Sequence, residues 1–395
     1  MKLAKRLQQI EPFHVMDLLA RAQTMQQQGQ DVIHLEVGEP DFPSPDAVIQ
    51  AGINALNHGQ THYTGATGLP QLKQKIAQFY QSRYGEQVEP ERIVITPGAS
   101  GALQLITSLI MDPDETLLLT DPGYPCNRHF LANINADGQL IQTKAEDGFH
   151  LTPEQVAEHW QTSTVGALVA TPSNPTGALM REEQLRSLHQ AIRSKQGILL
   201  VDEIYHGLTY NGQAPYSAVN YGDDVFVINS FSKYFAMTGW RLGWLVAPKW
   251  AIKGIDKLAQ NLFLAPNTPA QYAALDCFDA NVIEELEIRK NAFSDRLGFL
   301  LPKLEALGFR IPAKPEGAFY IYADISGLNH KFSQDSMGFC HDLLEKKALA
   351  ITPGVDFGHA QGNHFVRFAY TSDIPVLSNA IDRLSEYLQD TQISD

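Results

Sequence analysis

The segment from Ser230 to Arg241 carries residue types from which a covalent catalytic site can be built. It follows the apolar run 225–228 and contains Ser230, Ser232, Lys233 and Arg241. A lysine at the end of a strand can form a Schiff base with an aldehyde, and a nearby arginine can hold a phosphate through two parallel hydrogen bonds. Together these groups suit a phosphorylated aldehyde cofactor, of which pyridoxal phosphate is the obvious one.

Taken alone, this segment could equally be an amphipathic loop with a surface lysine, so its meaning depends on the elements around it. Polar or turn-forming residues follow five apolar runs: Pro97 to Gly101 after 93–96, Asp121 to Tyr124 after 117–120, Thr171 to Gly177 after 167–170, Asp202 to Tyr205 after 198–201, and Ser230 to Lys233 after 225–229. The carboxyl ends of parallel strands meet at one edge of a sheet, where ligands bind. Five such strand ends favour one shared pocket over coincidence.

Each of these polar groups has a role that it could fill in such a pocket. Gly98 to Gly101 would open a helix and point backbone N–H groups at an anion. Tyr124 could stack on a flat ring, and Asp202 could keep a pyridine nitrogen protonated. Asn174 and Tyr205 could donate to a phenolic oxygen. Singly, each residue also has an ordinary reading as a helix cap, a core aromatic, a strand-end carboxylate or a turn residue.

The pattern of apolar runs predicts an α/β fold. Runs that are apolar throughout, such as 198–201, 225–228 and 244–246, indicate strands buried on both faces of a largely parallel sheet. Segments with helical spacing, such as 182–193, lie between them. The pattern becomes long and helical from about 273 to 307, and strands at 319–322 and 365–368 then indicate a smaller α+β unit.

Composition narrows the class of protein. The chain has 395 residues, a formal net charge of -14, 44% hydrophobic and 19% charged residues. Such a length suggests two or three domains, and the acidic balance argues against nucleic acid or an anionic membrane as partner. No apolar run approaches a membrane-spanning length, and the basic amino terminus has no apolar core of a secretory signal. We find no metal-ligand cluster and expect no metal site.

The three cysteines point to the compartment in which the protein works. Cys126, Cys277 and Cys340 are odd in number, widely separated and without CxxC spacing. They are expected to be reduced thiols in a cytoplasmic protein.

The combination of motifs resembles the class I (fold-type-I) pyridoxal-phosphate-dependent aminotransferase family across nearly the whole chain. The motifs that carry this resemblance are Leu35 to Phe42, Tyr63 to Gly68, Ser173 to Gly177, Asp202 to Tyr205, Ser230 to Arg241, and Arg367. The Ser-x-Ser-Lys segment combined with Asn-Pro-Thr-Gly upstream is the most specific of them. The resemblance implies a large domain with a mostly parallel sheet flanked by helices (45–275). It also implies a small α+β domain formed by the two chain ends, with 1–44 as an arm joining 276–395.

The resemblance also implies a role for each site residue. Lys233 would carry the internal aldimine, with Asp202 at the pyridine nitrogen, Asn174 and Tyr205 at the ring oxygen, and Tyr124 stacked on the ring. The residues expected around the phosphate are Ala99, Ser100, Gly101, Ser230, Ser232 and Arg241, although Ser232 could serve the loop instead.

The substrate groups and the second subunit follow in the same way. Arg367 would clamp the substrate α-carboxylate, with Gly38 and Asn174 beside it. Without the family pattern, Arg367 would read as a salt-bridged arginine on a strand. Tyr63 is expected to reach the phosphate of a neighbouring subunit, which makes a homodimer necessary for a complete site.

The function implied is transamination between an amino acid and a 2-oxo acid, through a Lys233 aldimine and a pyridoxamine phosphate intermediate. A β-eliminating lyase on the same fold is the near alternative. Ser100 within Gly98 to Ala102 superficially resembles a hydrolase nucleophile elbow, although Ala102 breaks the Gly-x-Ser-x-Gly form. A non-catalytic regulatory module would need a DNA-binding domain for which the chain has neither room nor charge.

The donor is the least determined part of the reaction. We find no second cation that is placed to hold a distal carboxylate, which favours a neutral or apolar donor. The pocket mouth is expected to include 13–15 and the partner's Tyr63 loop. The resemblance to the family suggests 2-oxoglutarate as the amino acceptor.

Overall fold

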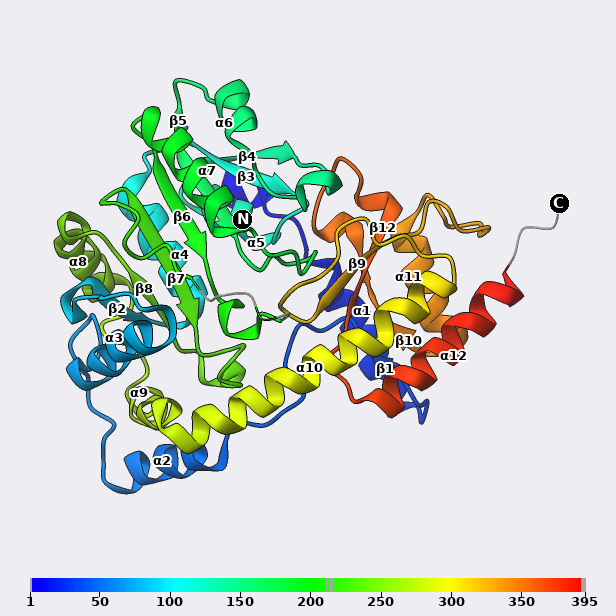
Figure 1. Ribbon diagram of the computed structural model, residues 1–395, viewed down its shortest axis with the longest axis horizontal. Helices are drawn as coiled ribbons and strands as arrows, with labels where there is room; N and C mark the ends of the chain where they lie inside the picture. The colour runs from blue at the N-terminus through cyan, green and yellow to red at the C-terminus, as the bar shows by residue number, and fades with distance from the viewer. Residues whose placement is uncertain (1, 211, 213–215, 392–395) are drawn as a thin grey trace.

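A seven-stranded sheet forms the centre of the large domain (Figure 1). The computed structural model describes residues 2–210, 212 and 216–391. In spatial order the strands are β2 (Ile93–Thr96), β8 (Gly243–Val246), β7 (Val225–Ser230), β6 (Ile198–Asp202), β5 (Thr164–Ala170), β3 (Thr116–Asp121) and β4 (Asp137–Gln142). The neighbours from β7 to β4 pair in parallel. β2 runs in the same direction as β7, because both pair antiparallel with β8, so the five strand ends that the sequence singled out share one edge of this sheet.

Two strands differ from what the apolar pattern predicts. β8 has the apolar run expected of a parallel strand, but it pairs antiparallel with both β2 and β7. Its four residues are all buried, so burial on two faces, and not strand direction, explains its composition. β4 was not predicted, because its sequence DGQLIQ is polar and half-exposed at the sheet edge.

Helices cover both faces of the sheet because successive side chains of each strand point to opposite sides. On β3, Leu117 and Leu119 join one core cluster and Leu118 joins the other. The first cluster includes α4 (Gly98–Ile110), α5 (Cys126–Asn133) and α8 (Ile252–Leu262). The second includes α3 (Pro70–Tyr84), α6 (Pro153–His159), α7 (Glu182–Ser194) and α9 (Thr268–Leu275). α2 (Asp46–Asn57) packs on α9.

The small domain is built from both ends of the chain. β11 (Thr352–Pro353), β12 (Phe365–Ala369) and β9 (Tyr320–Asp324) form one antiparallel sheet, and β1 (Ile33–His34) pairs in parallel with β10 (Leu349–Ala350). α1 (His14–Gln27), α11 (Ser336–Lys347) and α12 (Ile374–Asp390) lie beside these strands (Figure 1). The predicted strands 319–322 and 365–368 are thus confirmed, and β1 of the amino-terminal segment pairs with a strand from the carboxyl-terminal third of the chain.

One long helix connects the two domains. α10 (Ala280–Ala306) runs from beside α9 to the small domain and is the yellow diagonal of Figure 1. The predicted helical stretch 273–307 is interrupted at Asp279, whose extended backbone separates α9 and a short 3-10 turn from α10. Among the residues that the structure describes, no helix is both long enough and apolar enough to cross a membrane.

Candidate active site

A cavity of about 240 Å³ lies at the carboxyl edge of the large sheet, where both domains contribute to its wall. Twelve of the fourteen residues that the sequence singled out line it: Gly38, Ala99, Ser100, Tyr124, Asn174, Asp202, Tyr205, Ser230, Ser232, Lys233, Arg241 and Arg367. Most of them lie at or just after the carboxyl ends of strands of the large sheet, where the topology brings them together, whereas Gly38 comes from the amino-terminal arm and Arg367 from β12 of the small domain.

Two of the sequence candidates do not line the cavity. Gly101 is on the second turn of α4, and its amide donates to the carbonyl oxygen of Pro97 as an ordinary helix would require. Tyr63 lies on a loop before α3, with 81% of its surface exposed in the single chain. Neither residue contacts the cavity within the described part of one chain.

One end of the cavity is built to receive an anion. α4 begins at Gly98, so the amides of Ala99 and Ser100 lie in its first turn, where they have no carbonyl partner within the helix. Gly98 has a φ of +70°, and a Cβ there would lie 2.7 Å from Nη2 of Arg241. Arg241 itself adopts a left-handed conformation, with φ at 53°. This backbone arrangement aims a guanidinium at the start of the helix.

Two serines complete the anion end. The hydroxyl of Ser230 donates to the hydroxyl of Ser232 at 2.9 Å, and the amide of Ser232 donates to the hydroxyl of Ser230 at 3.0 Å. Both serines line the cavity. Ser232 therefore stabilises the loop and also faces the site, so the two roles that the sequence left open are compatible.

Lys233 is one of the residues that line the cavity. Its Nζ donates to the carbonyl oxygen of Gly38 at 2.6 Å. Burial, together with the charges of Arg367 and Arg241, lowers the pKa of Lys233 to about 8, although Glu39 and Asp202 oppose the shift. A larger fraction of this amine is therefore neutral near physiological pH than of an exposed lysine, as nucleophilic attack on an aldehyde requires.

Asp202 is a buried carboxylate at the end of β6. The amide of Ile204 donates to its Oδ1 at 3.1 Å. Burial raises the pKa of Asp202 to about 7, with Glu203 adding to the shift and Lys233 opposing it. A buried carboxylate with a raised pKa stabilises a positive charge placed beside it more than a solvated one does.

Tyr205 is held by a residue that the sequence analysis did not single out. Its hydroxyl lies 2.7 Å from the hydroxyl of Tyr320, which comes from β9 of the small domain and also lines the cavity. The sequence places Tyr320 only within the predicted strand 319–322. The run Phe319-Tyr320-Ile321-Tyr322 was the available signal, but nothing in it indicated which tyrosine faces the site.

Arg367 is almost fully buried on β12. Its Nη1 donates to Oδ1 of Asn174 at 2.9 Å, and its Nη2 donates to the carbonyl oxygen of Glu36 at 2.6 Å. Its Nε is buried without a hydrogen-bond partner among the described residues. The guanidinium also lies 4.3 Å from the ring centre of Tyr320. Arg367 is thus a cation that neutral oxygen atoms hold in place. The alternative interpretation, an arginine in a salt bridge, does not fit these contacts.

The amino-terminal arm supplies a wall that the sequence anticipated only in part. Phe13 and Val15 line the cavity, as expected of 13–15, and so do Met16 and Leu19 farther along α1. Thr238 and Ile204 were not anticipated. They are ordinary residue types in loops, and only their place in the fold brings them to the cavity.

The residues present fit pyridoxal 5'-phosphate. The start of α4, Arg241 and the serine pair match a phosphate, the Lys233 amine matches an aldehyde, and Asp202 matches a ring nitrogen that carries a proton. Phosphate, aldehyde and pyridine partners occur in one cavity, which makes this fit more specific than any one of them.

Comparison with known proteins gives the same result. The sequence model described as aminotransferase class I and II matches residues 30–384. The chain is 35% identical to a valine–pyruvate aminotransferase of Mycobacterium tuberculosis, with 96% of this chain and 97% of that protein covered. It is 32% identical to an aspartate aminotransferase of Bacillus subtilis, with 98% of this chain and 99% of that protein covered.

The structural likeness is equally complete. The crystal structure of an aminotransferase from Mycobacterium tuberculosis superposes with a TM-score of 0.94 at 34% identity, covering 99% of this chain and 100% of that chain. The chain therefore belongs to the class I and II aminotransferases and is a transaminase that depends on pyridoxal 5'-phosphate.

Proposed function

We propose that this transaminase moves the α-amino group of an amino acid with a neutral or apolar side chain to a 2-oxo acid. The observation that carries the proposal is the placement of Arg367, Lys233 and Asp202 in one cavity. Arg367 offers a fork for an α-carboxylate, and Lys233 offers an amine of lowered pKa beside it.

The charges of the cavity wall support a donor without a distal carboxylate. Among the described residues, the cations that line the cavity are Lys233, Arg241 and Arg367. In this proposal Lys233 reacts with the cofactor aldehyde, Arg241 binds the phosphate and Arg367 binds the α-carboxylate. No cation of this set is then left to bind a distal carboxylate. The apolar side chains of α1 face the same space. The relative named for valine and pyruvate is consistent with this choice, and the relative named for aspartate makes a dicarboxylic donor the alternative to test.

In the reaction, each group of the chain has one task. Bound pyridoxal phosphate supplies a reversible attachment for the amino group and a ring that withdraws electrons. Arg367 and Asn174 hold the α-carboxylate, so that the Cα–H bond is oriented toward Nζ of Lys233. Lys233 takes the α-proton and later returns it as a general base and acid. Asp202 would keep the nitrogen of the bound ring protonated, Tyr124 would pack against the ring, and Tyr205 would donate a hydrogen bond to its oxygen.

The assembly and the domain limits are part of the same proposal. We propose a homodimer in which Tyr63 contributes to the neighbour's phosphate site. The exposed apolar residues Ile53 and Leu56 on α2 support a partner surface near that loop. We keep 1–44, 45–275 and 276–395 as arm, large domain and small domain. We also propose a cytoplasmic location, which the number and spacing of the cysteines support.

The first experiment is a spectroscopic titration. The purified protein with bound cofactor is mixed with single amino acids, and the visible band of the pyridoxal form is followed in the absence of any oxo acid. Conversion to the pyridoxamine form with valine, leucine or alanine is expected, and addition of 2-oxoglutarate should restore the original band. Conversion with aspartate alone would contradict the proposed donor class. Ammonia and pyruvate as products would indicate the lyase.

Two variants test the catalytic assignments. Lys233→Ala is expected to abolish turnover, because the proton-transferring amine is lost. Asp202→Ala is expected to bind the cofactor but to lose most of the rate. Turnover near the wild-type value in either variant would contradict the role given to that residue.

A further inference from the structure

The apolar wall of the cavity comes from the first turns of α1. Phe13, Val15, Met16 and Leu19 line the cavity. A second set on the same helix, Leu18, Ala22 and Met25, is buried in the core. α1, with its N-cap residue Phe13, therefore has one set of residues that anchors it in the core and another that lines the cavity. The position of the first turn of α1 therefore determines the position of this apolar part of the cavity wall.

The start of α1 is capped from a distant part of the chain. Phe13, which occupies the N-cap position, makes no side-chain cap hydrogen bond. Instead, the amide of His14 donates to Oδ1 of Asp356 at 3.0 Å, and the amide of Val15 donates to Oδ2 at 2.9 Å. Asp356 is only 3% exposed. Both carboxylate oxygens thus satisfy amides that the helix leaves without partners.

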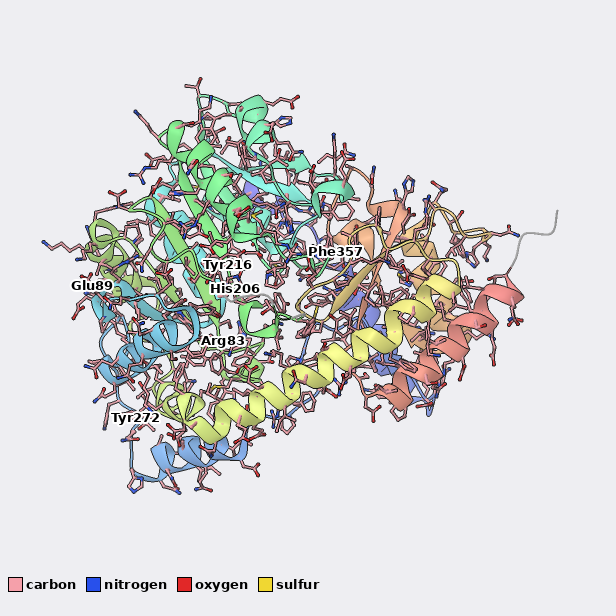
Figure 2. All side chains as sticks on the ribbon, in the orientation of Figure 1. Arg83, Glu89, His206, Tyr216, Tyr272 and Phe357 are labelled. Carbon is pink, nitrogen blue, oxygen red and sulfur yellow. The ribbon has the colours of Figure 1, made fainter. Side chains whose placement is uncertain are left out.

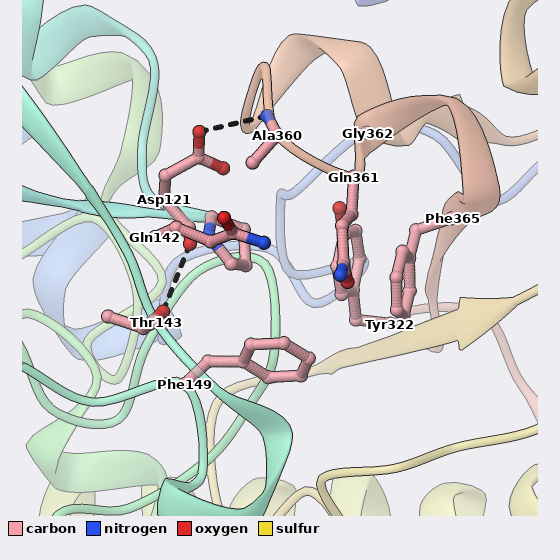
Figure 3. A pocket seen from close by; sticks show the side chains of 10 residues that line it. Asp121, Gln142, Thr143, Phe149, Tyr322, Ala360, Gln361, Gly362 and Phe365 are labelled. Atoms are coloured by element: carbon pink, nitrogen blue, oxygen red, sulfur yellow. Dashed lines mark hydrogen bonds between the residues drawn. The ribbon is translucent and has the colours of Figure 1, made fainter.

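The turn that carries Asp356 is itself fixed to the large domain. The amide of Gly123 donates to the carbonyl oxygen of Phe357 at 2.8 Å. The amides of His359 and Ala360 donate to Oδ2 of Asp121 at 3.0 and 3.1 Å, and Figure 3 shows the bond to Ala360. These bonds hold the turn against the carboxyl end of β3 and the loop after it, which contains Tyr124.

The same turn also contacts Arg367, which lines the cavity. The ring centre of Phe357 lies 4.7 Å from the guanidinium of Arg367. Figure 2 places Phe357 between the two domains. Asp356, next to it in sequence, thus connects the neighbourhood of the carboxylate clamp with the apolar wall of α1.

We propose that Asp356 is a positioning residue for substrate selection, because it fixes the first turn of α1 and with it the wall that receives an apolar donor side chain. The inference rests on the proposed function for the identity of the bound amino acid. Asp356 does not touch the reacting atoms. Its effect should grow with the size of the donor side chain and should be small for alanine.

The matched pair of variants is Asp356→Asn and Asp373→Asn. Asp373 caps α12 by accepting from the amide of Val376, and it does not line the cavity. The two substitutions make the same chemical change at a helix start of the small domain. In half-reactions with alanine, valine and leucine, Asp356→Asn is expected to lower the leucine-to-alanine ratio of kcat/KM by about fivefold, the scale of a lost cap. Asp373→Asn is expected to leave that ratio unchanged.

Two further measurements separate this role from a loss of folding. Amide hydrogen exchange of the peptide 11–20 should be faster in Asp356→Asn and unchanged in Asp373→Asn, with or without cofactor. Met16→Ala removes part of the wall and leaves both capped amides in place. It should lower the same ratio, and Asp356→Asn should add little to it in the double variant, because both act on one wall.

The outcomes are distinct. A ratio that stays at the wild-type value in Asp356→Asn, or unchanged exchange of the peptide 11–20, would overturn the inference. An equal loss for all three donors would also overturn it, because that is the result of general destabilisation. Failure of the wild-type protein to convert any amino acid would instead contradict the proposed function, and the exchange experiment would still test the capping of α1.

Discussion

The hydroxyl oxygens of Tyr205 and Tyr320 lie 2.7 Å apart, and this contact joins the large domain to the small domain inside the cavity. Tyr320 also presents its ring to the guanidinium of Arg367. A Cβ on residue 38 would lie 2.0 Å from the Tyr320 hydroxyl. Tyr320 thus contacts three groups of the cavity wall: the hydroxyl of Tyr205, the guanidinium of Arg367 and the loop that contains Gly38.

Tyr320→Phe should lower kcat while leaving the fold intact. The change removes the hydroxyl that holds Tyr205 and keeps the ring beside Arg367. One neutral hydrogen bond is worth about 1 kcal/mol, so a loss of about fivefold in kcat is expected. Tyr322→Phe is the control, because Tyr322 stacks on Phe365 and does not line the cavity. Equal kinetics for the two variants would show that the Tyr205–Tyr320 contact does not affect catalysis.

Gly38→Ala should be much more damaging, and its damage should depend on Tyr320. The added methyl group has no room beside a buried hydroxyl, so kcat/KM is expected to fall by more than about tenfold, as overpacking costs 1 to 3 kcal/mol. Removing the hydroxyl increases the nearest distance from 2.0 to 2.9 Å. The double variant Gly38→Ala with Tyr320→Phe should therefore recover part of the loss. Additive losses in a double-mutant cycle would contradict the steric explanation.

Cofactor loading should depend on pH through Lys233. Attack on an aldehyde needs the neutral amine, and the pKa of Lys233 is lowered to about 8 in the folded protein. The rate constant for binding pyridoxal phosphate to cofactor-free protein should rise from pH 6.5 and level off above about pH 9. Stopped-flow absorption measures it directly.

Arg367→Gln provides the internal check on this pH dependence. Arg367 is the largest charge that lowers the pKa of Lys233, after burial itself. Removing it should raise that pKa and shift the loading profile to higher pH. A wild-type midpoint near pH 10.5, or a profile that does not move in Arg367→Gln, would show that the surroundings of Lys233 do not tune its amine.

The sequence predicted those parts of the site that follow strands of the sheet. Asn174, Asp202 and Lys233 come directly after the apolar runs of β5, β6 and β7, and parallel pairing then places them at one edge. The order of elements was enough to bring them together. The positions of Ala99 and Ser100 were predictable for the same reason, because α4 begins directly after β2.

The sequence could not predict contacts that depend on how the domains pack. Tyr320 meets Tyr205 across 115 positions, and Asp356 meets Val15 across 341 positions. Neither residue belongs to a local pattern that would mark it, since tyrosine is ordinary in a strand and aspartate is ordinary in a turn. The antiparallel direction of β8 was missed for a related reason, because burial on both faces leaves the same apolar run in either direction.

The last prediction concerns stability in acid. Burial lowers the pKa of His150 to about 4, whereas an imidazole in the unfolded chain titrates near 6.5. Between these two pH values the unfolded chain binds a proton that the folded protein does not, so stability is fully present above about pH 6.5 and is lost as pH falls toward 4. His150→Gln should lose about 2 kcal/mol less than the wild type between pH 7.5 and pH 5.

Urea unfolding at the two pH values measures that difference. His62→Gln, at an exposed position, is the control and should lose as much stability as the wild type. The difference between variants matters here, because other groups also titrate in this range and contribute equally to all three proteins. If His150→Gln loses as much stability as the wild type, the imidazole of His150 must be protonated in the folded protein, and its burial cannot explain the acid sensitivity.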